Sequence, residues 1–384
     1  MALSTIGTNQ IASEAVTVPK VADQVLSSKN LIINGDMQCW QRATAATAAN
    51  NSYATVDRWA FGESTDGAYT SEQSTDTPTG TGFSVKAQVT TADTSIAAAQ
   101  FAYIYQEIEA QNLQPLQYGT SSAKTLTLSF WVKSNKTGTY TINLVKRDST
   151  AYLIPVEYTI SSANTWEKKT ITITPTAGST SLITASAGAI ANDNGHGIQL
   201  GFGLAWGSDY HGTSNTWSAS SHYGTSNQVN WMDSTSNNFY LSQVQLEVGD
   251  TATPFEHRSF GDELARCQRY LYRRDFNIYD VVCQGAALGN KGSYCLHLPV
   301  SMRAKPSCSQ GSGIYCWYNQ AGSITTQTGL AVSYMGNNDT NMTQAFIRAD
   351  DNSTAASATN YPLGLTSYNS SGSNSTFIQL DAEL

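Results

Sequence analysis

The chain has 384 residues, a formal net charge of −8 and 13% charged residues, about half of the roughly 25% that is usual in globular domains. An acidic chain without a Lys- or Arg-rich run is not expected to bind nucleic acid or an anionic membrane surface. No apolar run reaches the roughly 18 residues of a membrane span, and the N-terminus lacks the features of a signal peptide. Abundant Ser, Thr, Asn and Gly favour an all-β fold with polar turns.

Aliphatic residues recur every five positions near the N-terminus, a period that fits neither a helix nor a strand. One such segment cannot bury its own aliphatic side chains, whereas two or three copies wound together can. We therefore expect residues 1–30 to form an oligomerising and anchoring stem, with a disordered tail as the alternative. The repeated positions are Ile6, Ile11, Val16, Val21 and Leu26.

Residues 31–258 have the pattern of a β-sandwich. Segments of roughly 6–10 residues alternate apolar and polar side chains between polar turns. The clearest segments are 98–110 and 123–134, with alternating positions at Phe101, Tyr103, Tyr105, Glu107, Glu109, Leu126, Leu128, Phe130 and Val132. The tryptophans that lie on or beside the expected strands are interpreted as core residues. They are Trp40, Trp59, Trp131 and Trp166.

A loop-rich insertion is expected from about residue 187 to 237, before a last alternating strand. Pro254 then breaks that strand, and a charged segment predicts a connector helix over 259–273. In this helix Ser259 is the expected N-cap with Asp262 three residues on, and one apolar stripe packs on a domain or a neighbouring subunit. The stripe consists of Leu264, Cys267 and Leu271. Residues 274–384 predict a second, smaller β-sandwich, the C-terminal tip.

Five stretches resemble, in their order, tailed-phage virion fibre proteins that carry a carbohydrate-binding-module-like jelly roll. They are NLIINGDMQCWQR (30–42), DRW (57–59), YQEIEA (105–110), LTLSFWVKSNKTGTY (126–140) and QVQLEVGDTATPFEHRSFGDELARCQRYLYR (243–273). The resemblance implies a structural protein of the virion, assembled in the host cytoplasm as a homotrimer. It also implies attachment to tail or capsid proteins and contact with host surface glycans.

Glycans are held by stacking on aromatic faces, with polar groups reading the hydroxyls, and loops often carry such binding residues. The expected binding residues of the insertion are Trp206, Tyr210, His211, Trp217, Tyr223 and Trp231. In the tip, Tyr315 and Trp317 are further candidates, because the far end of a fibre meets the cell. The alternative in both places is that the rings only anchor loops or fill a core.

No catalysis, cofactor or metal is expected. Glu107 and Glu109 share one face of a strand, but a structural strand is the preferred interpretation over a glycosidase pair. The five histidines lack ligand spacing, and turn chemistry explains the Asp- and Asn-rich loops at 191–197 and 336–341. The six cysteines are expected to be free thiols. A decoration protein without a receptor and a glycan depolymerase remain the alternative functions.

Overall fold

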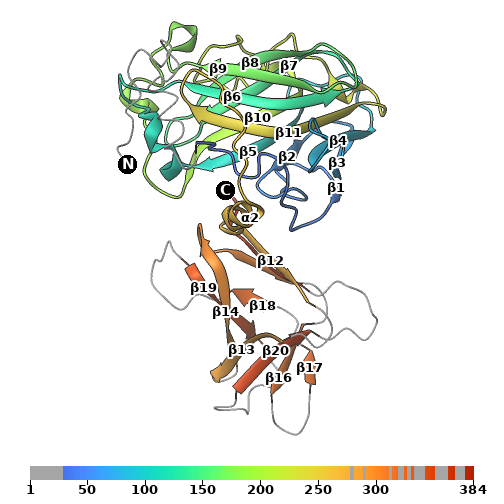
Figure 1. Cartoon of the computed structure of the whole chain (residues 1–384), viewed down its shortest axis with the longest axis vertical. Helices are drawn as coiled ribbons and strands as arrows, with labels where there is room; N and C mark the ends of the chain where they lie inside the picture. Colours follow the sequence, from blue (N-terminus) through green and yellow to red (C-terminus); the bar gives the residue numbers. More distant parts are fainter. Residues whose placement is uncertain are drawn as a thin grey trace, which may run out of the picture.

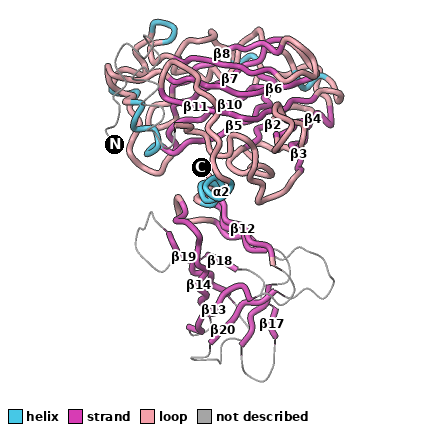
Figure 2. Tube along the Cα trace, viewed as in Figure 1, coloured by secondary structure: helices cyan, strands magenta, loops and turns pink. Residues whose placement is uncertain are grey.

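The computed structural model describes residues 29–276, 281–288, 291–310, 314–318, 324–326, 330–332, 342–350, 362–367 and 377–384. The repeated positions Ile6, Ile11, Val16, Val21 and Leu26 lie outside these residues, so the stem stays a prediction. Figure 1 shows two bodies joined at a narrow waist, where α2 (Phe260–Gln268) lies. Figure 2 shows that strands make up most of the regular structure in both bodies, which confirms the all-β fold class.

The upper body is a sandwich of two antiparallel sheets. The six-stranded sheet contains, in spatial order, β1 (Ala45–Thr47), β3 (Ala68–Ser74), β4 (Ser84–Thr91), β11 (Asn238–Val248), β6 (Leu126–Ser134) and β9 (Glu167–Ile173). The five-stranded sheet contains β2 (Ala60–Glu63), β5 (Phe101–Glu109), β10 (His196–Trp206), β7 (Gly138–Lys146) and β8 (Tyr152–Ile160). Short 3₁₀ turns lie at Ala110–Leu116, Ala177–Ser179, Ser186–Gly188, Ser208–Tyr210 and Trp231–Asp233.

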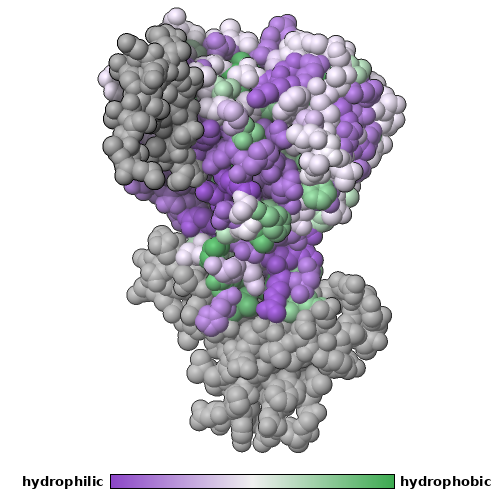
Figure 3. Space-filling model, in the orientation of Figure 1, coloured by the Kyte–Doolittle hydropathy of each residue, from purple (hydrophilic) through white to green (hydrophobic). Residues whose placement is uncertain are grey.

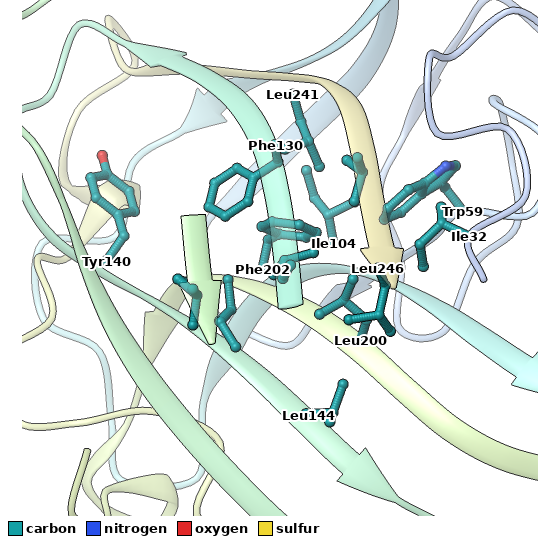
Figure 4. Packing of buried hydrophobic residues seen from close by; sticks show 14 of the residues in the cluster. Ile32, Trp59, Ile104, Phe130, Tyr140, Leu144, Leu200, Phe202, Leu241 and Leu246 are labelled. Atoms are coloured by element: carbon teal, nitrogen blue, oxygen red, sulfur yellow. The ribbon is translucent and has the colours of Figure 1, made fainter. Parts of the chain in front are cut away.

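The main core lies between these two sheets. Alternate residues of each strand point inward, so Ile104 of β5 and Phe202 of β10 meet Phe130 of β6 (Figure 4). Phe130 packs edge-on against Phe202, with ring centroids 5.0 Å apart. Trp59 is fully buried in this cluster, as predicted. Burial of so many apolar side chains is the main favourable contribution to folding.

The predicted loop-rich insertion of 187–237 is only partly correct, because β10 (His196–Trp206) is a central strand between β5 and β7. Its glycines weaken the sequence signal for a strand. They are needed here because the outer face of the sheet is crowded. A Cβ on Gly203 would lie 2.2 Å from Trp206 Nε1, and one on Gly201 would lie 2.6 Å from Asn143 Oδ1.

Two of the tryptophans predicted to be core residues lie elsewhere. Trp131 and Trp166 are half-buried on the outer face of the six-stranded sheet, so that prediction is wrong. Trp166 covers Lys133, whose ammonium lies 5.3 Å from the indole centroid and 4.3 Å from the Tyr240 ring centroid. Trp40 is half-buried and packs against the edge of the core.

The lower body contains two further antiparallel sheets. The three-stranded sheet consists of β12 (Leu271–Asp275), β21 (Phe377–Asp381) and β15 (Ser307–Gln310). The seven-stranded sheet consists of β17 (Ile324–Thr326), β16 (Ile314–Tyr318), β20 (Pro362–Ser367), β13 (Val281–Leu288), β14 (Lys291–Met302), β19 (Met342–Asp350) and β18 (Leu330–Val332). β12 leads directly to the waist (Figure 1), and β21 pairs with it.

The connector helix is shorter than the predicted 259–273. Ser259 caps it as expected, because its Oγ accepts the Asp262 backbone N–H at 3.2 Å. The helix ends at Gln268, and Leu271 begins β12 instead of extending an apolar stripe. The chain turns into a strand at that point because it pairs with β21 of the lower body.

The buried face of the helix also differs from the predicted stripe. Cys267 is buried as expected, but Leu264 is only half-buried, and Glu263 lies inside. Arg258 and the Asn34 backbone N–H both contact the Glu263 carboxylate. A buried carboxylate needs such partners, so α2 is joined to the sandwich by polar contacts as much as by apolar ones.

Of the three cysteines whose side chains are described, Cys39 and Cys267 are buried free thiols, as predicted, whereas Cys308 is a half-buried free thiol. Within the described part of the chain no helix is long and apolar enough to cross a membrane. Figure 3 shows a surface that is hydrophilic over much of the upper body in this view, with hydrophobic residues gathered at the waist. One of the exposed large apolar residues is Phe260, at the start of α2, with 60% of its surface exposed.

Candidate functional site

A second cluster of aromatic rings covers the outer face of the five-stranded sheet, and we call it the aromatic face. Its buried part consists of Ala60, Tyr103, Tyr105 and Trp206, and its half-buried rim consists of Tyr53, Phe101, Tyr210 and Tyr223. The main core takes the other side of the same strands, because side chains alternate between the two faces of a sheet. β5 is therefore buried on both faces, with aliphatic residues inward and aromatic residues outward.

Glycines on the neighbouring strands make room for the large rings. Tyr103 lies opposite Gly62 of β2 and Gly203 of β10, and a Cβ on Gly62 would lie 2.0 Å from its ring. Gly224 has the same effect in the loop, since a Cβ there would lie 2.4 Å from the Trp206 indole. Because glycine carries no side chain at these positions, the aromatic rings can lie flat against the backbone.

The rings pack in fixed geometry. Tyr103 and Tyr105 are stacked with centroids 4.8 Å apart and planes at 17°. Trp206 packs on Tyr103 at 5.0 Å and stacks on Tyr223 at 5.2 Å and 23°. Tyr210 meets the Trp206 ring edge-on at 5.4 Å. Tyr210 and Tyr223 come from the loop after β10, so the loop and the sheet build this face together.

A polar group adjoins the rings at the end of β5. The Glu107 carboxylate lies 3.2 Å from Arg147 Nε and 3.6 Å from His196 Nδ1. Arg147 also donates to Gln199 Oε1 at 2.7 Å. Arg147 and His196 are partly exposed, with side-chain exposures of 36% and 48%. The arrangement places donors and acceptors of both charges beside aromatic surface.

Several buried polar atoms on this side of the sheet have no hydrogen-bond partner within the protein. Six of the thirteen such side-chain atoms in the described residues are found here, on Glu107, Asn143, Gln199, Trp206 and Gln228. Both Nδ2 and Oδ1 of Asn143 are among these atoms. Buried polar groups are normally paired, so this concentration of unpaired atoms indicates that ordered water or another partner outside the protein satisfies them.

The hydroxyls of Tyr103, Tyr105 and Tyr223 are neutral donors at physiological pH. Burial, assisted by Tyr223, raises the pKa of Tyr103 to about 12. Burial likewise raises the pKa values of Tyr105 and Tyr223. Burial lowers the pKa of Arg147, but the Glu107 carboxylate and the neighbouring tyrosines together raise it more, so the guanidinium stays charged. The face thus offers neutral hydroxyls next to one persistent ion pair.

The structure brings together three of the residues predicted to bind glycans, Trp206, Tyr210 and Tyr223. It places Trp217 and Trp231 in the main core, with exposures of 2% and 0%, so the prediction that they bind sugar is wrong. Trp217 Nε1 donates to the Thr174 carbonyl at 2.9 Å. Trp231 packs edge-on against Tyr69 at 5.7 Å. These two rings anchor the loop through contacts distant in sequence.

Of the remaining candidates, the structure describes His211 and Glu109 fully, and neither belongs to the aromatic face. The His211 ring contacts the Trp206 carbonyl at 3.0 Å, so it braces the loop. Tyr315 and Trp317 lie on β16, but their side chains are outside the described residues, and their role stays a prediction. Glu109 is fully buried and receives two hydrogen bonds from Arg269, at 3.0 Å each, which tie β5 to the waist.

The sequence analysis missed Tyr53, Phe101, Tyr103 and Tyr105 as site residues. The signal was present in β5, where Phe101, Tyr103 and Tyr105 alternate with residues of the main core. A strand with aliphatic residues on one face and aromatic residues on the other indicates two packed or functional faces. Tyr53 carries no such signal, because the loop that bears it reaches the sheet only through tertiary contacts.

Other places in the described residues are weaker candidates for a functional site. No group of three metal-ligating side chains occurs among them, and Asp193 Oδ1 accepts the Gly195 N–H in an ordinary turn. A hollow of about 670 Å³ opens at the waist beside α2, lined in part by Arg258 and Arg269. Both arginines already pair with carboxylates, so this hollow is part of the joint.

No family model and no curated protein matches the chain. Among solved structures, it is similar to the enzymatically active domain of tailspike protein 4 of bacteriophage CBA120, with 11% identity and a TM-score of 0.28. That match spans 57% of this chain and 21% of the tailspike chain. A putative sugar binding protein from Bacteroides thetaiotaomicron matches at 12% identity and a TM-score of 0.33, over 57% of this chain and all of that one.

The family 11 carbohydrate-binding module from Clostridium thermocellum, solved with a mixed-linked tetrasaccharide, matches at 11% identity and a TM-score of 0.28. The match covers 55% of this chain and 99% of the module. At these TM-scores the likeness is distant, and the function proposed below rests on the residues of this chain.

Proposed function

We propose that the aromatic face binds a glycan of a host cell surface without cleaving it. The observation that carries the proposal is the rim of half-buried rings, Tyr53, Phe101, Tyr210 and Tyr223, beside the Glu107–Arg147 pair. Sugar rings present C–H groups on their faces and hydroxyls on their edges. Aromatic rings accommodate the C–H faces, and carboxylate, guanidinium and amide groups bind the hydroxyls.

We propose no catalysis because the two acidic residues of β5 already form ion pairs with arginines. Glu109 is buried and held by Arg269, and Glu107 pairs with Arg147. Glycoside hydrolysis needs one carboxylic acid that can donate a proton and a second carboxylate on the other side of the bond. A depolymerase using these residues would first have to release both from their ion pairs.

At the level of the whole protein, we propose a trimeric fibre subunit of a tailed-phage virion. The order of the five sequence stretches and the five-residue repeat at the N-terminus support this proposal. Residues 1–30 would then attach to a tail or capsid protein, and the lower body would point away from the particle. A capsid decoration protein without a receptor is the second candidate, because the same stem could serve it.

Binding of fluorescently labelled protein to a panel of bacterial cells tests the proposal, with purified surface polysaccharides as competitors. Binding that one polysaccharide abolishes, without new reducing ends, is the expected result. Reducing ends that disappear in Glu107→Ala would establish the depolymerase instead. An intact oligomer that binds no cell and no polysaccharide would favour the decoration protein.

A further inference from the structure

Residues 377–384 join the lower body to the sandwich, and we call this segment the clasp. Its strand β21 pairs with β12 and β15 of the lower body. Beyond the strand, the Ala382 N–H donates to the Tyr270 carbonyl at 2.7 Å, and Arg303 donates to the carbonyls of Ala382 and Glu383. The clasp therefore ends at the waist, where Figure 1 places the C-terminal end beside α2.

The Glu383 carboxylate lies between two arginines of the sandwich. Its Oε1 is 3.2 Å from Arg42 Nη2, and its Oε2 pairs with Arg58 Nη1. The side chains of Arg42, Arg58 and Glu383 are only 6%, 1% and 5% exposed. Burial lowers the pKa of Arg58, but Glu383, Tyr270 and Tyr53 together raise it more, so the guanidinium stays charged. Loss of this carboxylate would leave two buried guanidinium groups without their shared partner.

The same contacts continue to the aromatic face. Arg58 Nη2 donates to the Glu107 carbonyl at 2.6 Å, directly behind the carboxylate that pairs with Arg147. The Tyr53 hydroxyl donates to the Leu384 carbonyl at 3.3 Å. The Tyr53 ring in turn meets Tyr105 edge-on, with centroids 6.4 Å apart. Tyr53 of the face and the adjoining Glu107 are thus in contact with the clasp or with the arginine that it holds.

We propose that Glu383 is a positioning residue for the aromatic face. By holding Arg42 and Arg58 at the waist, it fixes the Tyr53 side chain and the Glu107 backbone in the arrangement that receives the glycan. The inference rests on the proposed function and deepens it, because a residue carried by the lower body then sets the geometry of a face on the upper one. Coupling through packed and charged contacts of this kind changes ligand affinity without touching the ligand.

The variants Glu383→Gln and Asp381→Asn separate this role from a general effect of charge at the waist. The first keeps the side-chain shape but removes the charge shared by both arginines. The second is the matched control, because the ion pair of Asp381 is with Arg42, its side chain is 29% exposed, and asparagine keeps an oxygen for the Glu383 N–H. We expect Glu383→Gln to weaken polysaccharide binding about tenfold and Asp381→Asn to change it less than about twofold.

Hydrogen–deuterium exchange of the unliganded protein gives a readout that does not depend on the glycan. Glu383→Gln is expected to speed exchange in residues 51–59 and 103–107, and Asp381→Asn is not. A milder variant, Tyr53→Phe, removes only the hydrogen bond to Leu384. It is expected to weaken binding by about threefold while the sandwich stays folded.

The outcomes separate the two proposals. If the wild-type protein binds a polysaccharide and Glu383→Gln binds it equally well, the positioning role is wrong and the proposed function stands. If the wild-type protein binds none, the proposed function fails. The exchange measurement then decides the role of Glu383: unchanged exchange in residues 51–59 overturns it, and faster exchange there supports it.

Discussion

At the scale of single residues, one buried lysine shows how polar contacts stabilise the turns of this sandwich. Lys146, at the end of β7, is fully buried, and its ammonium donates to the carbonyls of Asp148, Thr150 and Ala187. The last two contacts are 3.1 and 3.2 Å long. Burial lowers the pKa of this lysine, but three carbonyl acceptors offset part of the lost hydration.

Lys146→Met is therefore expected to destabilise the protein by about 3 kcal/mol, because it leaves three carbonyls without their shared donor. The matched control is Lys168→Met, at an exposed position of β9, with an expected change within about 0.5 kcal/mol. Urea unfolding, followed by far-ultraviolet circular dichroism, measures both. Equal stabilities of the two variants would show that the buried ammonium is not a structural contact.

Residue types alone predicted only in part which aromatic side chains lie in the aromatic face and which lie in the core. The sequence analysis expected Trp206, Tyr210 and Tyr223 to share a site, and the structure brings them together. The same reasoning failed for Trp217 and Trp231, which are equally aromatic and lie in the same glycine-rich context. Their burial comes from Thr174 and Tyr69, and such long-range contacts leave no local pattern in the sequence.

At the scale of elements, β10 is the strand that local reasoning interpreted least well. Its glycines suggested a loop, yet they lie where the rings of the aromatic face need space. Strands such as β5 and β6, with regular alternation, were predicted within a few residues. The helix α2 was predicted at its N-cap but not at its end, because pairing of β12 with β21 is a tertiary contact.

Gly203→Ala tests this account of β10. The added Cβ would lie 2.2 Å from Trp206 Nε1 and 2.8 Å from Thr141 Oγ1, so the indole must move. We expect a loss of about 2 kcal/mol in the free energy of unfolding and weaker glycan binding. Urea unfolding measures the first effect, and titration with the polysaccharide, followed by intrinsic tryptophan fluorescence, measures the second.

A contrasting glycine lies on α2. A Cβ on Gly261 would meet nothing within 4 Å, and alanine favours a helix over glycine. Gly261→Ala is thus expected to leave the aromatic face unchanged and to stabilise the protein by up to about 1 kcal/mol. If both glycine variants had the same effect on stability, crowding at β10 would not explain the glycines of that strand.

At the scale of the whole molecule, the two bodies meet at a waist built from α2, the clasp and several buried charges. Arg269 reaches from the end of α2 to Glu109 of the sandwich, and Arg303 reaches from the lower body to the Asn194 carbonyl at 2.7 Å. The sequence predicted a joint at this place, but the return of residues 377–384 to the sandwich could not be inferred from it. That return depends on Glu383 meeting arginines more than 300 positions earlier in the chain.

The proposed fibre predicts a homotrimer in solution. Light scattering during gel filtration is expected to give a mass three times that of the 41.3 kDa chain. A protein that lacks residues 1–28 is expected to elute as a monomer with the same sandwich, because the five-residue repeat lies in that segment. A full-length chain that stays monomeric at micromolar concentration would contradict the fibre proposal.

The central claim is that the aromatic face of the five-stranded sheet binds glycan, and calorimetric titration of two variants tests it most directly. The titrant is the polysaccharide that competes for cell binding. Tyr223→Ala removes a half-buried ring stacked on Trp206, and Trp166→Ala removes a half-buried ring on the opposite sheet. The account predicts that Tyr223→Ala lowers the affinity at least about tenfold and that Trp166→Ala leaves it unchanged. Unchanged binding by Tyr223→Ala, or a loss confined to Trp166→Ala, would place the glycan elsewhere and contradict the claim.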